Sequence, residues 1–428
     1  MLRREAAWEY LRGALWVLPA IAVVIALLLG SLLSSVNPAP DTWLYRLAFQ
    51  GTPDDARTLL IGTAGTMITV IALVLGLTVV ALQLSSTQFS PRILRNFLRD
   101  RSNQLVLSVF VATFAYSMAG LYTVGVSAGG RTSDYPRLAV TWAIALLFLS
   151  LGALVYEVHH LSHSMQVDEI MRKVERETSE VVRHGLLDSA GSAQPPRVLS
   201  TAVVVSSALT GYVQAVHADA VVAGAELHDV SVRIAVRAGD HVAAVSTPLA
   251  WVWSNSGRVV DAAEVGPAVE QAVRIGFERT LEQDAAFGLR QLVDVASKAL
   301  SPAINDPYTA VQAVDHLTAV MSILARRDLG PLVLATTGGS VTVPAYDFAD
   351  YLDLACAQIR RYGSREPTVA LALIRLLRDC AVVTAEADRR VAIAGQLRLI
   401  VDDATRDIVQ PADRTAITAA ADLLRQQL

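Results

Sequence analysis

The stretch that decides the fold is LQLSSTQFSPRILRNFLRDRSN, Leu82–Asn103, which separates two long runs without a charged residue. Apolar side chains are interleaved in it with four arginines, Arg92, Arg95, Arg99 and Arg101. Asp100 is its only acidic residue. A basic, amphipathic connector between uncharged helices is typical of the inner side of a membrane protein, so the stretch predicts both a class of fold and an orientation.

Four runs are apolar enough to cross a bilayer, for which a helix needs about 20 residues. They are Ala14–Val36, Leu59–Leu84, Leu105–Val126 and Leu138–Tyr156, and none contains Asp, Glu, Lys or Arg. The apolar core of the first is too long for a signal peptide, so we expect it to remain as a span. Coupled carriers usually keep an ionisable residue at mid-membrane, and its absence from these runs disfavours that class.

The arginines around the spans predict their orientation. Three precede the first span, at Arg3, Arg4 and Arg12, and the connector after the second span carries four more. Residues 37–55 are acidic, and residues 129–137 carry only two arginines and one aspartate. The positive-inside rule then predicts a multi-pass protein of the inner (plasma) membrane, with both termini and everything after about residue 160 in the cytoplasm.

The second span carries small and weakly polar residues at close to a 3.5-residue repeat: Gly62, Gly65, Thr69, Ala72, Gly76, Gln83 and Thr87. Such a stripe lets helices approach closely in lipid. It can also line a narrow wet path without charge. The sequence leaves both interpretations, helix packing and pore lining, open.

Three arginines of the connector, Arg92, Arg95 and Arg99, share one helical face by their spacing. One interpretation is that they fix topology and contact anionic lipid. The other is that they form a basic ring at the inner mouth of an anion path. His159 and His163 are also spaced to share a face, but two histidines at a membrane boundary are more typical of interfacial polar groups than of a metal site, and we predict no metal.

The composition differs between the two parts of the chain. Of 428 residues, 53% are hydrophobic and 18% are charged. Met1–His163 holds 11 Lys and Arg against 8 Asp and Glu, a net charge of +3, and the remainder holds 25 against 32, a net charge of −7. A mildly acidic chain without a basic tract argues against nucleic acid as a partner.

Residues 1–160 are thus predicted to form a transmembrane module, and residues 161–195 a helical connector and linker in which the fourth span continues as one helix to Gly185. Residues 196–260 alternate as strands do and predict a small β module. This module resembles half of a biotinyl/lipoyl-type β-sandwich, through Val236, Gly239, Asp240, Val242, Pro248 and Leu249. It contains no lysine to modify, so we interpret it as structural.

Residues 261–428 predict a helical domain. Asp306 and Pro307 are expected at the N-cap and first position of a helix, and Ser364 is expected to cap another. Asp284 is assigned to a charged helix face together with Glu282, Arg290, Asp294 and Lys298. Cys356 and Cys380 lie in apolar helical sequence and are expected to be buried thiols. The fold class is therefore a mainly α membrane protein: a four-helix transmembrane module followed by a cytoplasmic α+β region, with a small β-sandwich-like module and a helical domain.

Three segments carry a family resemblance: ALQLSSTQFSPRILRNFLRDRSNQLVLSVFVATFAYS, DAAFGLRQLVDVASKALSPAINDPYTA and QIRRYGSREPTVALALIRLL. Together they resemble the bacterial membrane-protein family known as domain of unknown function 2254. The resemblance implies four N-terminal spans and a cytoplasmic C-terminal region. It implies no catalytic residues.

Two functions fit these observations. The first is a homo-oligomeric channel or pore-like assembly around the second span, passing an ion or small solute, with the cytoplasmic region as a gating collar. The second is a membrane-anchored scaffold or sensor without transport activity. Phosphate-loop, nucleophile-elbow and zinc-protease motifs are absent from the sequence, so we expect no enzyme and no cofactor. The partners expected are the lipid bilayer and further copies of the chain.

Overall fold

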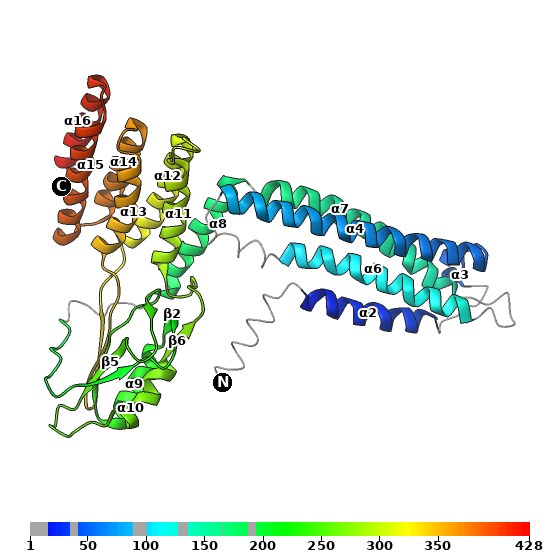
Figure 1. The fold of residues 1–428 in the computed structure, drawn as a ribbon, viewed down its shortest axis with the longest axis horizontal. Helices are drawn as coiled ribbons and strands as arrows, with labels where there is room; N and C mark the ends of the chain where they lie inside the picture. The colour runs from blue at the N-terminus through cyan, green and yellow to red at the C-terminus, as the bar shows by residue number, and fades with distance from the viewer. Residues whose placement is uncertain (1–15, 35–41, 89–100, 127–135, 165, 187–193) are drawn as a thin grey trace. The chain divides into compact units, whose positions relative to one another are not determined.

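The computed structural model describes residues 16–34, 42–88, 101–126, 136–164, 166–186 and 194–428, and Figure 1 draws them as a ribbon. The chain divides into two compact units, Met1–Glu169 and Ile170–Leu428. Each unit has a hydrophobic core of its own.

Long apolar helices make up the first unit. They are α2 (Val17–Ser34), α4 (Pro53–Gln88), α6 (Arg101–Val126) and α7 (Arg137–Ser164), with the short helix α3 (Trp43–Leu47) between the first two. In the described part of the chain, the segments with the length and hydropathy of a membrane span are Val17–Ser34, Pro53–Val80, Arg101–Tyr122 and Arg137–Leu161. The predicted four-span module is confirmed.

Helix α6 is the centre of this bundle, because it packs against α2, α4 and α7 (Figure 1). One buried cluster takes a residue from each long helix: Ala26, Leu60, Tyr116 and Ala143. The Tyr116 hydroxyl donates a hydrogen bond to the Ala139 carbonyl at 2.9 Å, which satisfies a polar group where water is excluded. The middle of the bundle is therefore closed by side chains.

The second unit contains two β-sheets. The larger has the strand order β1-β5-β3-β8-β7 and the smaller the order β4-β2-β6. The strands are β1 (Val203–Ser206), β2 (Gly211–Val216), β3 (Ser231–Ile234), β4 (His241–Val242), β5 (Pro248–Trp253), β6 (Val273–Gly276), β7 (Leu332–Thr336) and β8 (Gly339–Val343). Strands β3 and β8 pair in parallel, and the other pairs are antiparallel.

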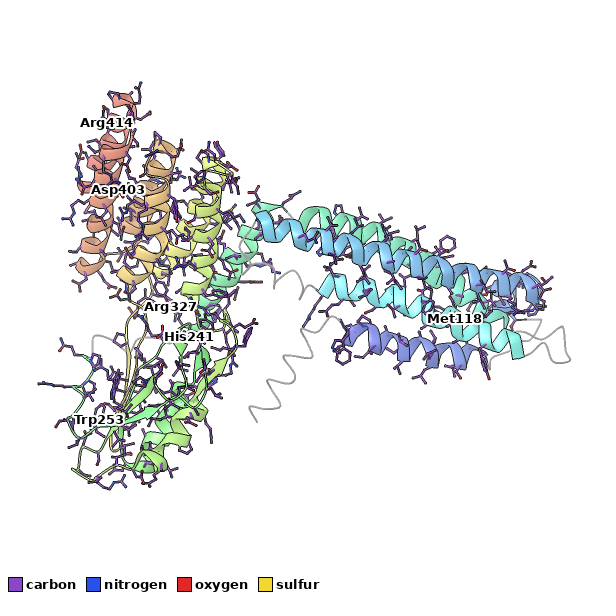
Figure 2. All side chains as sticks on the ribbon, viewed as in Figure 1. Met118, His241, Trp253, Arg327, Asp403 and Arg414 are labelled. Carbon is purple, nitrogen blue, oxygen red and sulfur yellow. The ribbon has the colours of Figure 1, made fainter. Side chains whose placement is uncertain are left out.

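Two helices, α9 (Ala218–His228) and α10 (Ala262–Ala272), share the core of these sheets. The β module is therefore α+β, and the region predicted to be helical, residues 261–428, contributes β6, β7 and β8 to it. A turn follows β3 at Arg237–Asp240: Asp240 Oδ2 accepts the Arg237 N–H at 2.8 Å, and Gly239 has φ +93°. Figure 2 labels His241 and Trp253 in this module.

Helices fill the rest of the second unit and stand side by side in Figure 1. They are α8 (Val167–Glu180), α11 (Ala285–Ala299), α12 (Pro307–Leu324), α13 (Phe348–Tyr362), α14 (Pro367–Val383), α15 (Ala387–Asp407) and α16 (Pro411–Arg425), and α8 continues into the π-helical turn η1 (Val181–Gly185). Helix α8 crosses α11 so closely that a Cβ at Gly288 would lie 1.9 Å from Thr178 Oγ1.

Helix boundaries confirm some local predictions and correct others. Asp306 caps α12 by accepting the Tyr308 and Thr309 N–H groups, with Pro307 at the first helical turn, as predicted. The single helix predicted from the fourth span to Gly185 is wrong, because α7 ends at Ser164 and α8 begins at Val167. Helix α8 is amphipathic and packs its narrow buried face against the helical domain. Helix α7 is largely apolar around its circumference, so the two helices have different packing requirements.

Candidate functional site

Helix α4 has two faces that differ in packing. Its inward face holds the buried residues Ala56, Leu60, Thr63, Ala64, Met67 and Val74. The predicted stripe residues Gly62, Gly65, Thr69, Ala72, Gly76 and Gln83 are all exposed. At about 100° per residue the two sets lie on opposite sides of the helix. The structure thus brings these six stripe residues together on the outward face of α4.

The stripe glycines are not used for packing inside the subunit. A Cβ added at Gly62, Gly65 or Gly76 would meet no atom within 4 Å. By contrast, a Cβ at Gly30 would lie 3.6 Å from Tyr116, and one at Gly120 would lie 3.4 Å from Leu60. Gly30 and Gly120 therefore lie at helix contacts, while the three glycines of α4, like Gly152 of α7, leave a shallow backbone surface facing outward.

The stripe presents polar groups that are satisfied within the helix. Thr69 Oγ1 donates to the Gly65 carbonyl at 3.3 Å, and Thr66 Oγ1 donates to the Gly62 carbonyl at 2.7 Å. Each hydroxyl keeps acceptor capacity for a further hydrogen bond. These two hydroxyls can therefore face lipid, another helix or water without an unpaired donor.

The remaining predicted site residues lie outside the part of the chain that the structure describes. These are the Thr87 side chain, Arg92, Arg95, Arg99 and the His163 side chain. His159 is described, and its side chain is exposed. No group of three or more His, Cys, Asp or Glu side chains in the described residues is placed to hold a metal ion.

Sequence reasoning missed a set of buried polar residues in the first unit. They are Thr63, Gln104, Ser108, Thr113, Ser117, Ser150 and Glu157. Thr113 Oγ1 and Ser150 Oγ lie 2.9 Å apart and join α6 to α7. The four-residue spacing of Gln104 with Ser108 and of Thr113 with Ser117 was a signal that the sequence contained.

Glu157 lies directly after the predicted end of the fourth span. The fourth candidate span continues to Leu161, five residues beyond the predicted boundary at Tyr156, and so includes Glu157. The Glu157 side chain is 1% exposed. It lies near one end of the span, so it does not supply the mid-membrane charge of a coupled carrier.

In the second unit, a cavity of about 50 Å³ lies between the β module and α13. The Arg237 guanidinium stacks 3.9 Å from the centre of the Tyr346 ring and pairs with Asp350 at 3.6 Å. Burial raises the pKa of Tyr346 and Tyr351 above the ordinary value. The cavity holds a few waters at most by volume, so we interpret this cluster as the joint between strands and helices.

Asp284 stabilises the same joint. It is 2% exposed, accepts the Phe287 N–H at 2.9 Å as the N-cap of α11, and binds Arg279 Nε at 2.8 Å. Burial raises the pKa of the Asp284 carboxyl, and Arg279 opposes that shift. The predicted charged-face role of Asp284 is therefore wrong, because the residue precedes the helix and points inward.

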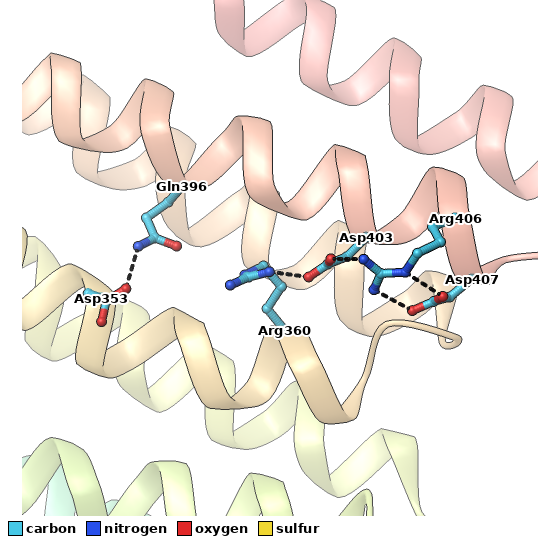
Figure 3. A network of polar contacts seen from close by, with 6 residues as sticks. All are labelled: Asp353, Arg360, Gln396, Asp403, Arg406 and Asp407. Carbon is cyan, nitrogen blue, oxygen red and sulfur yellow. Dashed lines mark hydrogen bonds and ion pairs between the residues drawn. The ribbon is translucent and has the colours of Figure 1, made fainter.

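Helices α13 and α15 are joined by a polar network, which Figure 3 shows. Gln396 Nε2 donates to Asp353 Oδ1 at 2.9 Å, and Arg360 binds Asp403. Asp403 also pairs with Arg406 at 2.9 Å. Arg406 and then Ser364 lower the pKa of Asp407 to about 2. Ser364 therefore bonds to the end of α15, and Glu366 occupies the N-cap position of α14 that was predicted for Ser364.

The two buried cysteines were predicted correctly. Cys356 and Cys380 are free thiols, each 0% exposed. Burial raises the pKa of Cys356 to about 12 and raises that of Cys380 as well. Both thiols are packed inside the helical domain.

Four apolar helices followed by an α+β unit define a multi-span membrane protein with a large domain outside the hydrocarbon. The family described as "Predicted membrane protein (DUF2254)" matches residues 12–379, and the chain belongs to it, as the resemblance predicted. Uncharacterised proteins of Mycobacterium tuberculosis (strain CDC 1551 / Oshkosh) and Mycobacterium bovis (strain ATCC BAA-935 / AF2122/97) are each 44% identical to it over 426 residues, which cover 98% of this chain and 81% of theirs. No solved structure matches the chain.

Proposed function

We propose that this protein is a homo-oligomeric channel of the bacterial plasma membrane, in which the outward faces of α4 from several copies surround a path for an ion or small solute. Both termini face the cytoplasm in this proposal, and the second unit forms a gating collar there. The arginine distribution of the sequence supports this orientation.

The observation that carries the proposal is the outward direction of the α4 stripe. Small residues are favoured where helices meet in lipid, because they let backbones approach. Here three glycines have no neighbour within 4 Å of an added Cβ inside the subunit. A second copy of the chain is the partner that would use such a face in every molecule.

A path between copies is favoured over a path through one subunit. The centre of the bundle is filled by Leu60, Tyr116 and Ala143, which are at most 1% exposed. The outward stripe combines glycine backbone with threonine hydroxyls, and uncharged polar surfaces of this kind line wettable pores. Several α4 helices around one axis would supply such a lining without any intramembrane charge.

The second candidate is a membrane-anchored scaffold, in which the same faces pack without leaving a path. The large exposed apolar side chains beside the stripe, Ile61, Ile68 and Leu73, favour it, because they would seal the contacts between helices. Both candidates predict self-association, and only the channel predicts water beside α4.

Cysteine labelling and flux in proteoliposomes test the choice. Thr69→Cys and Gly76→Cys are expected to react with a charged, water-soluble thiol reagent, and the reaction should reduce ion flux. Phe148→Cys is the matched control, because Phe148 is 68% exposed on α7 away from the stripe. The native cysteines give little background because both are buried. If the stripe cysteines are inert and the wild-type protein passes no ion, the channel is wrong and the scaffold remains.

A further inference from the structure

A basic groove lies in the second unit, and it has no part in the proposed channel face. Its volume is about 500 Å³. It is lined by Arg183 and His184 from η1, Arg326 and Arg327 after α12, and the apolar side chains Ile323 and Val383. Figure 2 labels Arg327 in this region. Segments far apart in the chain meet here. A hydrogen bond joins Arg327 to Arg183, about 140 residues away, and another joins Arg389 to Ala325, about 60 residues away.

The charge of the groove is opposite to that of its surroundings. Three of its lining residues are arginines, His184 is a fourth basic group and none is acidic, although the chain after His163 has 25 Lys and Arg against 32 Asp and Glu. Cations held within about 10 Å of one another repel at ordinary ionic strength. Glu180 lies 4.0 Å from His184, and both side chains are more than half exposed.

Structural roles explain only part of this charge. Arg327 Nη1 donates to the Arg183 carbonyl at 2.6 Å, which ties η1 to the end of α12. Arg389, behind the groove, donates to the Ala325 and Arg327 carbonyls at 2.6 Å each. These bonds satisfy carbonyl groups at a helix C-terminus, where cations are favourable.

Arg183 and Arg326 have no such role. Both are exposed, and neither side chain forms an ion pair with any residue in the described ranges. Their backbones are held in place by hydrogen bonds. The Arg183 carbonyl accepts a bond from the Arg327 guanidinium, and the Arg326 N–H donates to the Ile323 carbonyl at 3.1 Å. Two guanidinium groups without an ion-pair partner in the described part of the chain are therefore presented on a fixed frame. One of them belongs to a π-helical turn, an element frequent at functional sites.

We propose that this groove binds a phosphate-bearing small molecule. Guanidinium groups bind phosphate oxygens through paired, charge-assisted hydrogen bonds. The volume matches the range of about 300–1,000 Å³ that organic ligands occupy, so the ligand is larger than inorganic phosphate. Ile323 and Val383 supply an apolar wall for the part of the ligand that carries no charge.

Binding would act on the segment that follows the last span in the chain. The ligand would contact η1, which continues α8, and the end of α12, which is joined to α8 by Glu175 and His316 at 2.5 Å. A ligand held by both elements would stiffen this segment. The inference does not depend on the channel, because a scaffold with the same groove would bind the same ligand.

The test uses the full chain in phosphatidylcholine nanodiscs and calorimetric titration with three probes: ATP, inorganic tripolyphosphate and soluble dihexanoyl-phosphatidylglycerol. Saturable binding of at least one probe is expected. The double variant Arg183→Gln with Arg326→Gln should bind that probe with an affinity lower by about tenfold or more, because the loss of one charge-assisted hydrogen bond lowers affinity by about that factor. Ser322→Glu, which adds an acid to the groove and keeps both arginines, should weaken it as well.

The matched control is Arg361→Gln with Arg398→Gln, two exposed arginines outside the groove that change net charge equally. Its affinity should stay within about twofold of wild type. Binding of ATP or tripolyphosphate alone identifies a free phosphorylated ligand, and binding of the lipid alone identifies a headgroup. The proposal is overturned if none of the three probes binds saturably, or if both arginine pairs weaken binding equally.

Discussion

Replacing Gly65 by leucine should separate subunit folding from assembly. Inside the subunit, a Cβ at Gly65 meets no atom within 4 Å, so a leucine there creates no clash. Glycine is also the poorer helix former, and its replacement favours the helix by about 0.5–1 kcal/mol. The subunit fold is therefore expected to be unchanged or slightly more stable.

The contact between copies should respond in the opposite direction. Forcing a large side chain into a close-packed contact costs about 1–3 kcal/mol. At about 1.4 kcal/mol per tenfold, each contact between α4 helices would weaken by about 5- to 150-fold. Gly152→Leu is the matched control, because Gly152 on α7 is exposed and its Cβ also meets nothing within 4 Å.

Native mass spectrometry and thermal unfolding of the three proteins in one detergent measure the two effects. Gly65→Leu should shift the population toward single subunits without lowering the melting temperature, and Gly152→Leu should match wild type in both. An unchanged assembly state in Gly65→Leu, or equal dissociation in the two variants, would refute the assignment of the α4 stripe as the contact face.

Other positions give sharp expectations. Asp284→Ala should lower the free energy of unfolding, measured by denaturation, by an amount near the lower end of about 3–5 kcal/mol. The loss is at the lower end because the Arg279 side chain left without its partner is 26% exposed. Asp284→Asn keeps an acceptor for the helix cap, so its free energy of unfolding should fall by less. Cys356, whose pKa is raised to about 12, should stay unmodified by maleimide at pH 8 in the folded chain and react once denatured, so early labelling would contradict its burial. Replacing the three inner-mouth arginines (residues 92, 95 and 99) by glutamate should change anion-to-cation selectivity in bilayer recordings if they line a path. If they only fix topology, the replacement should disturb the orientation of the spans, which protease accessibility measures.

Sequence reasoning succeeded where the signal is local. The spans follow from uncharged runs of sufficient length, and the cap at Asp306 follows from an Asp-Pro pair. The stripe of α4 was visible as a repeat, but its outward direction was not, because either face of an apolar helix can be buried. The packing of α4 against α6 and α7 excludes the inward alternative.

The failures have a different cause. Strand β8 pairs in parallel with β3, Val341 beside Val232, and no local periodicity reports a partner more than one hundred residues away. Asp284 looked like part of a helix face, although it is the residue before the helix, because element boundaries are the weakest part of a periodic pattern. The groove between η1 and α12 could not be seen at all, since its arginines come together only in the folded unit.

Disulfide cross-linking of Thr69→Cys in native membranes measures the central claim most directly. A disulfide needs Cα atoms about 4.4–6.8 Å apart. Two α4 helices reach that distance only where their glycine faces approach each other, either in a packed contact or at a narrow point of a path between copies. The account predicts cross-linked pairs of chains for Thr69→Cys and single chains for Phe148→Cys under the same oxidant. Single chains for both, in a protein that remains folded, would contradict it.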